Sequence, residues 1–333
     1  METIRENRLE TRDALEVQTP TLQEVMRRLV PELKLWQKIS NAVSLRITAT
    51  TLLWIGLVIA AQRQFPHPLG SVAAFVLIAA LQHRMNVIQH EAIHRLFFSN
   101  RFINDLIGNH LFGASVLTPH TYREYHFKHH REVGRQTDPD YPGYNQFPTT
   151  AAGIAWFLLS GLLGIHVIKR FFQETADALQ RRAGVRTYHE RRGLWPALAA
   201  WVWVGAVQLL IWGIFLATGG STREFLIFWI LPEFTLTRTL MAVRLMGEHT
   251  TRGEAYSPDV RNLITLPCGA LERFFFSPLN FNCHAEHHLV PSIPWHRLPA
   301  FHRRMMRMRE YRSLVEVRPG YLWAIFNACT QTA

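Results

Sequence analysis

The chain has 333 residues, 48 % of them hydrophobic, and a formal net charge of +11 from 36 Lys and Arg against 25 Asp and Glu. This length allows one large domain or two small ones. Acidic runs, internal repeats and low-complexity stretches are absent from the sequence, so we expect no nucleic-acid partner. Its three cysteines, Cys268, Cys283 and Cys329, form no C-x-x-C pair, which argues against iron–sulfur and thioredoxin-like chemistry.

Residues 1–41 are predicted to form a polar cytosolic leader. An amphipathic helix over about Thr21–Ser40 is expected to lie at a membrane surface. The first 40 residues are charged and contain no apolar core of the signal-peptide type, so the first apolar segment should act as its own insertion signal.

Four apolar stretches follow that are long enough to cross a bilayer, which takes about 20 residues. They cover residues 42–61, 69–88, 195–218 and 225–246. The connectors at 62–68 and 219–224 are short, so each pair of spans should form a hairpin. A fifth run, 151–168, is shorter and is predicted to lie in the interface or against the other helices.

The distribution of basic residues predicts the orientation. Arg63 and Arg223 are the basic residues of the two connectors, whereas almost all others lie in the N-terminal, central and C-terminal regions. The positive-inside rule places those three regions in the cytoplasm. We therefore predict an all-α, multi-pass integral membrane protein whose residues 42–333 form one domain, with a cytosolic helical cap from residues 89–194 and 247–333.

Three histidine clusters lie on the predicted cytoplasmic side. Two are pentapeptides of identical spacing, His126-Phe-Lys-His129-His130 and His284-Ala-Glu-His287-His288, and both follow His90-Glu-Ala-Ile-His94. On a helix, positions i, i+3 and i+4 share a face, so each cluster directs its imidazoles to one side. Imidazole is a common ligand of iron, zinc and copper, and eight rings exceed the needs of one ion. The sequence therefore predicts a site for two metals.

A ninth candidate ligand is His249, which follows the fourth apolar stretch and should emerge on the same side as His90. The remaining histidines are expected to be structural or surface residues; they are His67, His83, His110, His120, His166, His189, His296 and His302. Asp138 and Asp140 are predicted to accept hydrogen bonds from ligand imidazoles or from the turn that holds them.

The first cluster also matches H-E-x-x-H, in which His90 and His94 would hold zinc and Glu91 would activate water. That alternative leaves both H-x-x-H-H clusters unexplained. With two metals, Glu91 instead orients a ligand histidine.

The chain resembles the membrane-bound fatty acid desaturase family, the histidine-box di-iron enzymes. The resemblance runs from about residue 45 to 305 and rests on four segments in the family's order: Gln89-His-Glu-Ala-Ile-His-Arg, Tyr125-His-Phe-Lys-His-His-Arg, Gly247-Glu-His and the stretch from Asn282 to Pro299. It implies that two iron ions are bound by His90, His94, His126, His129, His130, His249, His284, His287 and His288. It also implies four spans with a cytosolic cap over the metals.

The resemblance further implies an O2-dependent oxidoreductase of lipid metabolism that introduces a double bond into a fatty acyl chain, with O2 as co-substrate. The acyl chain could be carried by CoA, an acyl carrier or a phospholipid. The first cluster has three intervening residues where some acyl-CoA desaturases have four, which weakens assignment to that subgroup. No His-Pro-Gly-Gly segment of a fused cytochrome b5 is present, so electrons should come from a separate ferredoxin or cytochrome b5.

Other functions stay open at this point. The same metal site could hydroxylate or ketolate a lipid, sphingoid or carotenoid. A membrane zinc metalloprotease and a non-catalytic lipid-binding protein are more distant alternatives. Six arginines between residues 297 and 312 offer a surface for anionic lipid or for an acidic electron-transfer protein.

Overall fold

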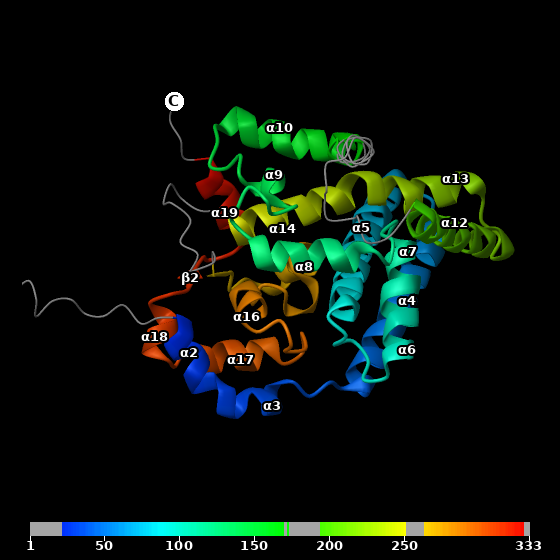
Figure 1. Cartoon of the computed structure of the whole chain (residues 1–333). Helices are drawn as coiled ribbons and strands as arrows, with labels where there is room; N and C mark the ends of the chain where they lie inside the picture. Colours follow the sequence, from blue (N-terminus) through cyan, green and yellow to red (C-terminus); the bar gives the residue numbers. More distant parts are fainter. Residues whose placement is uncertain (1–21, 170–171, 173–193, 251–262, 330–333) are drawn as a thin grey trace, which may run out of the picture.

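The computed structural model describes residues 22–169, 172, 194–250 and 263–329 (Figure 1). The first 21 residues of the predicted leader and His189 lie outside the described residues. Within the described part, four helical segments are long and apolar enough to cross a membrane. They are α4 (Asn41–Gln64), α5 (Pro68–Ile93), α12 (Leu194–Ala217) and the segment Thr222–His249. The predicted helical membrane fold with four spans is thereby confirmed.

The two hairpins turn at the same end of the molecule. Local sequence fixes each turn: Pro68 begins α5, and Ser221 forms a capping box with Glu224 at the start of the fourth span. Arg63, at the end of α4, pairs with Glu224 across 3.1 Å and donates to the Thr218 carbonyl at 2.9 Å. Both connectors are therefore side by side, and the opposite ends of all four spans face the cap.

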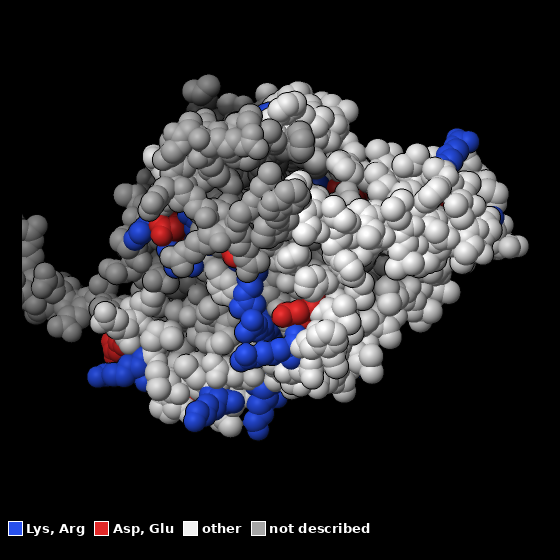
Figure 2. Space-filling view, turned by 45° about the vertical axis from the view of Figure 1, so that its right-hand side comes forward, with Lys and Arg blue, Asp and Glu red and all other residues white. Residues whose placement is uncertain are grey.

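The second and fourth spans form the centre of the bundle. In their most apolar stretches 61 % and 44 % of residues are buried, against 17 % for α4 and 22 % for α12. The core between them combines helix side chains with cap residues, among them Ile78, Met85, Ile88, Phe112, Phe228, Trp229, Phe281 and Trp295. Figure 2 shows a surface almost without charge on the right, over the spans, and clustered Lys and Arg towards the cap. The outer spans thus present an apolar face suited to lipid.

The fourth span is not a regular helix. It runs through α13 (Thr222–Phe225), η4 (Leu226–Ile230), η5 (Glu233–Thr237) and α14 (Arg238–His249), of which η4 and η5 are π-helical. Pro232 lies between the two π segments and has no N–H to continue the ladder. Buried Glu233 is paired with Arg238 across 2.6 Å, which compensates two charges at a depth where lone charges are costly.

The first part of the cap packs against the end of α5. It comprises α6 (Arg101–Ile103), η2 (Asn104–Phe112), α7 (Gly113–Ser115), α8 (Tyr122–Glu132), α9 (Tyr141–Tyr144) and α10 (Ala151–Leu162). η2 approaches α5 so closely that a Cβ on Gly108 would lie 2.3 Å from the Ala92 Cβ. Helix α10 has 12 residues, too few to span, as expected for the fifth apolar run.

The single helix predicted over 21–40 is instead divided into α2 (Leu22–Leu29), η1 (Val30–Glu32) and α3 (Leu33–Trp36). Pro31 explains the break, since it cannot donate to the preceding turn. Val25 and Leu29 of α2 are fully buried against Phe301, Met305 and neighbouring apolar residues. The polar segment before the first span is thus joined to the C-terminal part of the cap.

The second part of the cap follows the fourth span. Its helices are α15 (Ala270–Phe276), η6 (Pro278–Asn280), α16 (His284–Leu289), α17 (Leu298–Met305), α18 (Arg309–Arg312) and α19 (Tyr321–Ala328). Two short strands, β1 (Ile264–Thr265) and β2 (Glu316–Val317), pair in parallel. In Figure 1, α16 lies between α8 and α17, beside the ends of α5 and α14.

Candidate metal centre

All nine predicted ligand histidines lie in one region of the structure, delivered by four helices. His90 is in the last turn of α5 and His94 caps it, while His249 is the last residue of α14. Helix α8 carries His126, His129 and His130, and α16 carries His284, His287 and His288. Seven of these rings are buried; His94 and His130 are half-buried. The spacing of each cluster does direct its rings to one face, as the sequence predicts.

The rings form two adjacent groups. The first group consists of His90, His94, His126, His130 and His287. In it the His126 Nε2 atom lies 2.8 Å from that of His90, 2.9 Å from that of His94 and 2.8 Å from that of His130. The His287 Nε2 atom is 3.2 Å from that of His130.

The second group consists of His129, His249, His284 and His288. The Nε2 atoms of His284 and His249 are 2.9 Å apart, and His249 lies with His129 and His288 in one set of converging nitrogens. The groups adjoin, because the rings of His130 and His288 stack at 4.3 Å between centroids.

These distances fit metal ligation better than hydrogen bonding. A neutral imidazole nitrogen carries either one proton or one lone pair, so His126 Nε2 cannot make hydrogen bonds to three other ring nitrogens at once. Two nitrogens bound at right angles to one ion at about 2.1 Å are about 3.0 Å apart. The separations of 2.8–2.9 Å between these nitrogens are close to that value, so the first group could hold one ion. The donor set is all imidazole in the first group, and its nitrogen character suits iron, zinc or copper.

Burial keeps most of these rings neutral. Burial, with a smaller contribution from the Arg123 charge, lowers the pKa of His94 to about 3. Burial followed by neighbouring histidines holds the pKa values of His126, His130, His287 and His288 well below the usual range. Neutral rings present lone pairs, so the site is ready to bind cations near neutral pH.

His129 is the exception. Burial lowers its pKa, but the hydrogen bond to Asp138 and the charges of Asp140 and Asp138 together outweigh burial and raise it. The Nδ1 atom of His129 donates to Asp138, 2.9 Å and 3.1 Å from its two oxygens. Asp138 also accepts from the Tyr144 hydroxyl at 2.5 Å and from the Asp140 N–H. This carboxylate fixes the ring so that Nε2 faces the second group, as carboxylates do behind metal-bound histidines.

Two further carboxylates face Nδ1 atoms of the cluster. Glu248 Oε2 lies 3.4 Å from His284 Nδ1, and Glu91 Oε1 lies 3.8 Å from His90 Nδ1. Glu91 Oε2 accepts the backbone N–H of Trp295 at 3.2 Å, which anchors it to the loop after α16. Glu91 is thus located beside one ring of a five-histidine group, the position expected of an orienting residue.

Several residues of the site were not recognised in the sequence. Glu248 and Glu286 are fully buried carboxylates next to candidate ligand histidines in the sequence, and buried Tyr311 and Tyr321 donate to them. Both acids were visible within the box segments, as single charged residues among histidines. The tyrosines gave no signal in the sequence, because Tyr311 is 25 positions from Glu286 and Tyr321 is 73 positions from Glu248.

Aromatic side chains enclose the first group. The Phe281 ring meets His90 edge-on at 4.5 Å and His287 at 5.3 Å between centroids, and Phe127 lies 5.1 Å from His94. These two rings offer an apolar surface beside the first group.

Comparison with known proteins agrees with this geometry. The sequence profile of the family described as fatty acid desaturase matches residues 66–319. The chain is 25 % identical to a ceramide hydroxylase of Caulobacter vibrioides over 287 residues, which cover 78 % of each chain. It is 26 % identical to a beta-carotene ketolase of a Paracoccus species over 276 residues, 76 % of this chain and 93 % of the relative. The family match spans three quarters of the sequence and includes every histidine of both groups: the chain belongs to the fatty acid desaturase family.

Proposed function

We propose that this protein is an O2-dependent di-iron oxidoreductase that introduces a double bond into the acyl chain of a lipid. The observation that carries the proposal is the convergence of nine imidazoles, in two adjoining groups, at the ends of the two central spans of a fatty acid desaturase family member. Members of the family use a di-iron centre, which activates O2 so that an unactivated C–H bond can be broken.

The two groups define which residues would hold the irons. His90, His94, His126, His130 and His287 would hold one, and His129, His249, His284 and His288 the other. The surrounding residues keep these rings buried or half-buried and keep most of them neutral, and Phe281 and Phe127 cover part of the first group. Desaturation removes two hydrogen atoms from the substrate; with two electrons and two protons from outside, O2 leaves as two water molecules.

The location of the site supports a membrane lipid as substrate. His90 and His249 end the two central spans, so the metal groups lie where the spans meet the cap. The positive-inside rule makes this the cytoplasmic face. An acyl chain can reach this level from the bilayer, and Phe281 and Phe127 offer apolar walls beside the rings.

Hydroxylation or ketolation of a lipid is the second candidate, favoured by the similarity of the chain to a ceramide hydroxylase and a beta-carotene ketolase. In hydroxylation one oxygen atom of O2 enters the substrate and the other leaves as water, so the same two external electrons are needed. A zinc metalloprotease lacks comparable support, since His90 and His94 share their group with three further histidines.

The electrons are proposed to come from a separate one-electron carrier such as ferredoxin or cytochrome b5. The exposed arginines of the cap, including Arg303, Arg307, Arg309 and Arg312, give its surface the positive charge that attracts an acidic carrier.

Lipid profiling after expression in a heterologous host tests the proposal. A new lipid that lacks two hydrogens supports desaturation, and one that gains an oxygen atom supports the second candidate. Purified protein should contain two irons per chain. One zinc and no iron, together with an unchanged lipid profile, would refute both candidates.

A further inference from the structure

The segment that follows the last histidine cluster returns to the metal centre. Strand β2 pairs in parallel with β1, with Ile264 opposite Glu316 and Thr265 opposite Val317. Strand β1 in turn is joined to the third cluster, because the Leu266 N–H donates to the Asn282 carbonyl at 2.9 Å, two residues before His284. Strand β1 is therefore hydrogen-bonded both to the C-terminal strand β2 and to the segment that leads into the third cluster.

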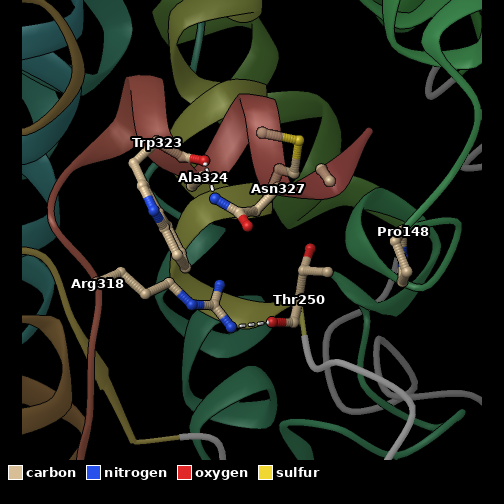
Figure 3. Close-up of a pocket in the computed structure, with 8 residues that line it drawn as sticks. Pro148, Thr250, Arg318, Trp323, Ala324 and Asn327 are labelled. Atoms are coloured by element: carbon tan, nitrogen blue, oxygen red, sulfur yellow. Dashed lines mark hydrogen bonds between the residues drawn. The ribbon is translucent and has the colours of Figure 1, made fainter. Parts of the chain in front are cut away.

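Arg318, directly after β2, binds the end of helix α14 (Figure 3). It is 4 % exposed, and its guanidinium donates to the Gly247 carbonyl at 2.8 Å and to the Thr250 carbonyl. Glu316 fixes the guanidinium from the other side at 2.7 Å and 3.1 Å. The last carbonyls of a helix lack intrahelical partners, and a cation there is favourable. His249 lies between the two carbonyls that Arg318 binds.

Tyr321 acts on the residue before His249. Its ring packs against the helix at Gly247, where an added Cβ would lie 3.1 Å from the ring. Its hydroxyl donates to Glu248 Oε1 at 2.9 Å, and the other oxygen of Glu248 faces His284 Nδ1 at 3.4 Å. Burial and the Glu248 charge raise the pKa of Tyr321 well above its usual value, so the hydroxyl keeps its proton and donates. Glu248 thus lies between the Tyr321 hydroxyl and the His284 ring of the second group.

Tyr311 makes the corresponding contact to the third cluster. Its hydroxyl donates to Glu286 Oε1 at 2.8 Å, and His302 Nδ1 donates to the same oxygen at 2.6 Å. The Thr265 hydroxyl reaches the other oxygen at 3.3 Å. Glu286 lies on α16 between His284 and His287 and is fully buried. These bonds fix the rotation of α16 about its axis, which decides where its three rings point.

We propose that Tyr311, Arg318 and Tyr321 form a C-terminal clamp of positioning residues that sets the metal affinity of the second histidine group, by fixing α16 and the end of α14. The inference rests on the proposed function, because it requires that these imidazoles bind metal. The clamp acts on both helices that supply His249, His284 and His288. Its loss should therefore weaken that group more than the first, which depends on α5 and α8 for four of its five rings.

Cobalt binding to the metal-free protein in detergent tests the clamp, with visible absorption as the signal. Tyr321→Phe keeps the ring but removes the hydroxyl; Arg318→Lys keeps the charge but not the two-pronged contact. Each should weaken the lower-affinity cobalt step about 10-fold or more, the range found when residues behind metal ligands are changed. The matched controls, Ser313→Ala and Arg312→Lys, alter exposed groups of the same segment and should bind cobalt as the parent does.

Thermal unfolding of the metal-free variants separates positioning from simple stabilisation. The clamp predicts weaker cobalt binding with a nearly unchanged unfolding midpoint for Tyr321→Phe. If affinity falls only in proportion to stability, or stays at the parent value, the clamp is refuted. Tyr311→Phe provides a second variant of the same kind should Arg318→Lys fail to fold.

A double-mutant cycle tests the path through Glu248. Tyr321→Phe should weaken cobalt binding less in a Glu248→Gln background than in the parent, since the hydroxyl then has no charged partner. Equal effects in both backgrounds would show that Tyr321 does not act through this carboxylate. Failure of the parent protein to bind cobalt at all would instead overturn the proposed function, so the two ideas fail in different ways.

Discussion

The two histidine groups are supported in different ways. The first depends mainly on packing: η2 lies against α5 at Gly108 and Ala92, and Phe281 meets the His90 ring edge-on. The second depends on buried hydrogen bonds, chiefly from His129 to Asp138 and from Tyr321 to Glu248. Packing tolerates little change of volume, whereas hydrogen bonds to charged groups are sensitive to the loss of one atom. We therefore expect different substitutions to impair metal binding by the two groups.

The largest effect is expected from removing a ring from either group. His287→Ala and His129→Ala each delete one ligand of a group, so product formation should fall to background and iron content should drop. Iron analysis and lipid profiling check this. His67→Ala, an exposed histidine at the start of α5, is the control. Full turnover in either His287→Ala or His129→Ala would contradict the di-iron assignment.

Asp138→Asn should act on the second group alone. The amide cannot accept from His129 Nδ1 as strongly as the carboxylate, so metal affinity should fall about 10- to 100-fold. Iron analysis of the purified variant should then approach one iron per chain. Glu132→Gln, which changes a half-buried carboxylate at the end of α8, the helix that carries His129, should retain two irons. Equal loss of iron from both groups would contradict the prediction that Asp138 supports the second group alone.

Gly108→Ala should act on the first group through packing. The new methyl group would lie 2.3 Å from the Ala92 Cβ, between His90 and His94 on α5, so η2 or α5 must move. Overpacking of this kind costs about 1–3 kcal/mol. We expect a lower midpoint of thermal unfolding and reduced iron content. Gly205→Ala in α12 serves as the control, because a Cβ added there has no atom within 4 Å. If both variants lose iron to the same extent, close packing at Gly108 is not the cause.

The smallest effect is expected from removing the ion pair between Glu32 and Arg304, which lies outside both histidine groups. The hydrogen bond from Arg304 lowers the pKa of Glu32 below its usual value. The pair therefore stabilises the fold fully above the usual carboxyl pKa, and its contribution disappears as the pH falls through the lowered pKa. Because the pair is partly exposed, Glu32→Gln should cost at most about 1 kcal/mol, with unchanged iron content. A loss of iron in this variant would show that η1 supports the centre.

Much of the architecture was accessible from local patterns. Apolar length predicted the four spans, and the i, i+3, i+4 spacing predicted that His126, His129 and His130 share a helix face. The single helix expected before the first span was wrong, because Pro31 divides it. The fourth span was predicted, but the sequence analysis did not address its π-helical segments around Pro232. Local preference and long-range packing compete at such positions, and periodicity alone does not resolve them.

By itself, the sequence determined the number and spacing of the clustered histidines and the apolar helical spans between them. These follow from composition and from periods of a few residues. Only the tertiary structure decided how nine rings divide into five and four, and which carboxylates and tyrosines stand behind them. Those features depend on contacts between residues far apart in the chain, such as Tyr321 with Glu248, which no local pattern encodes.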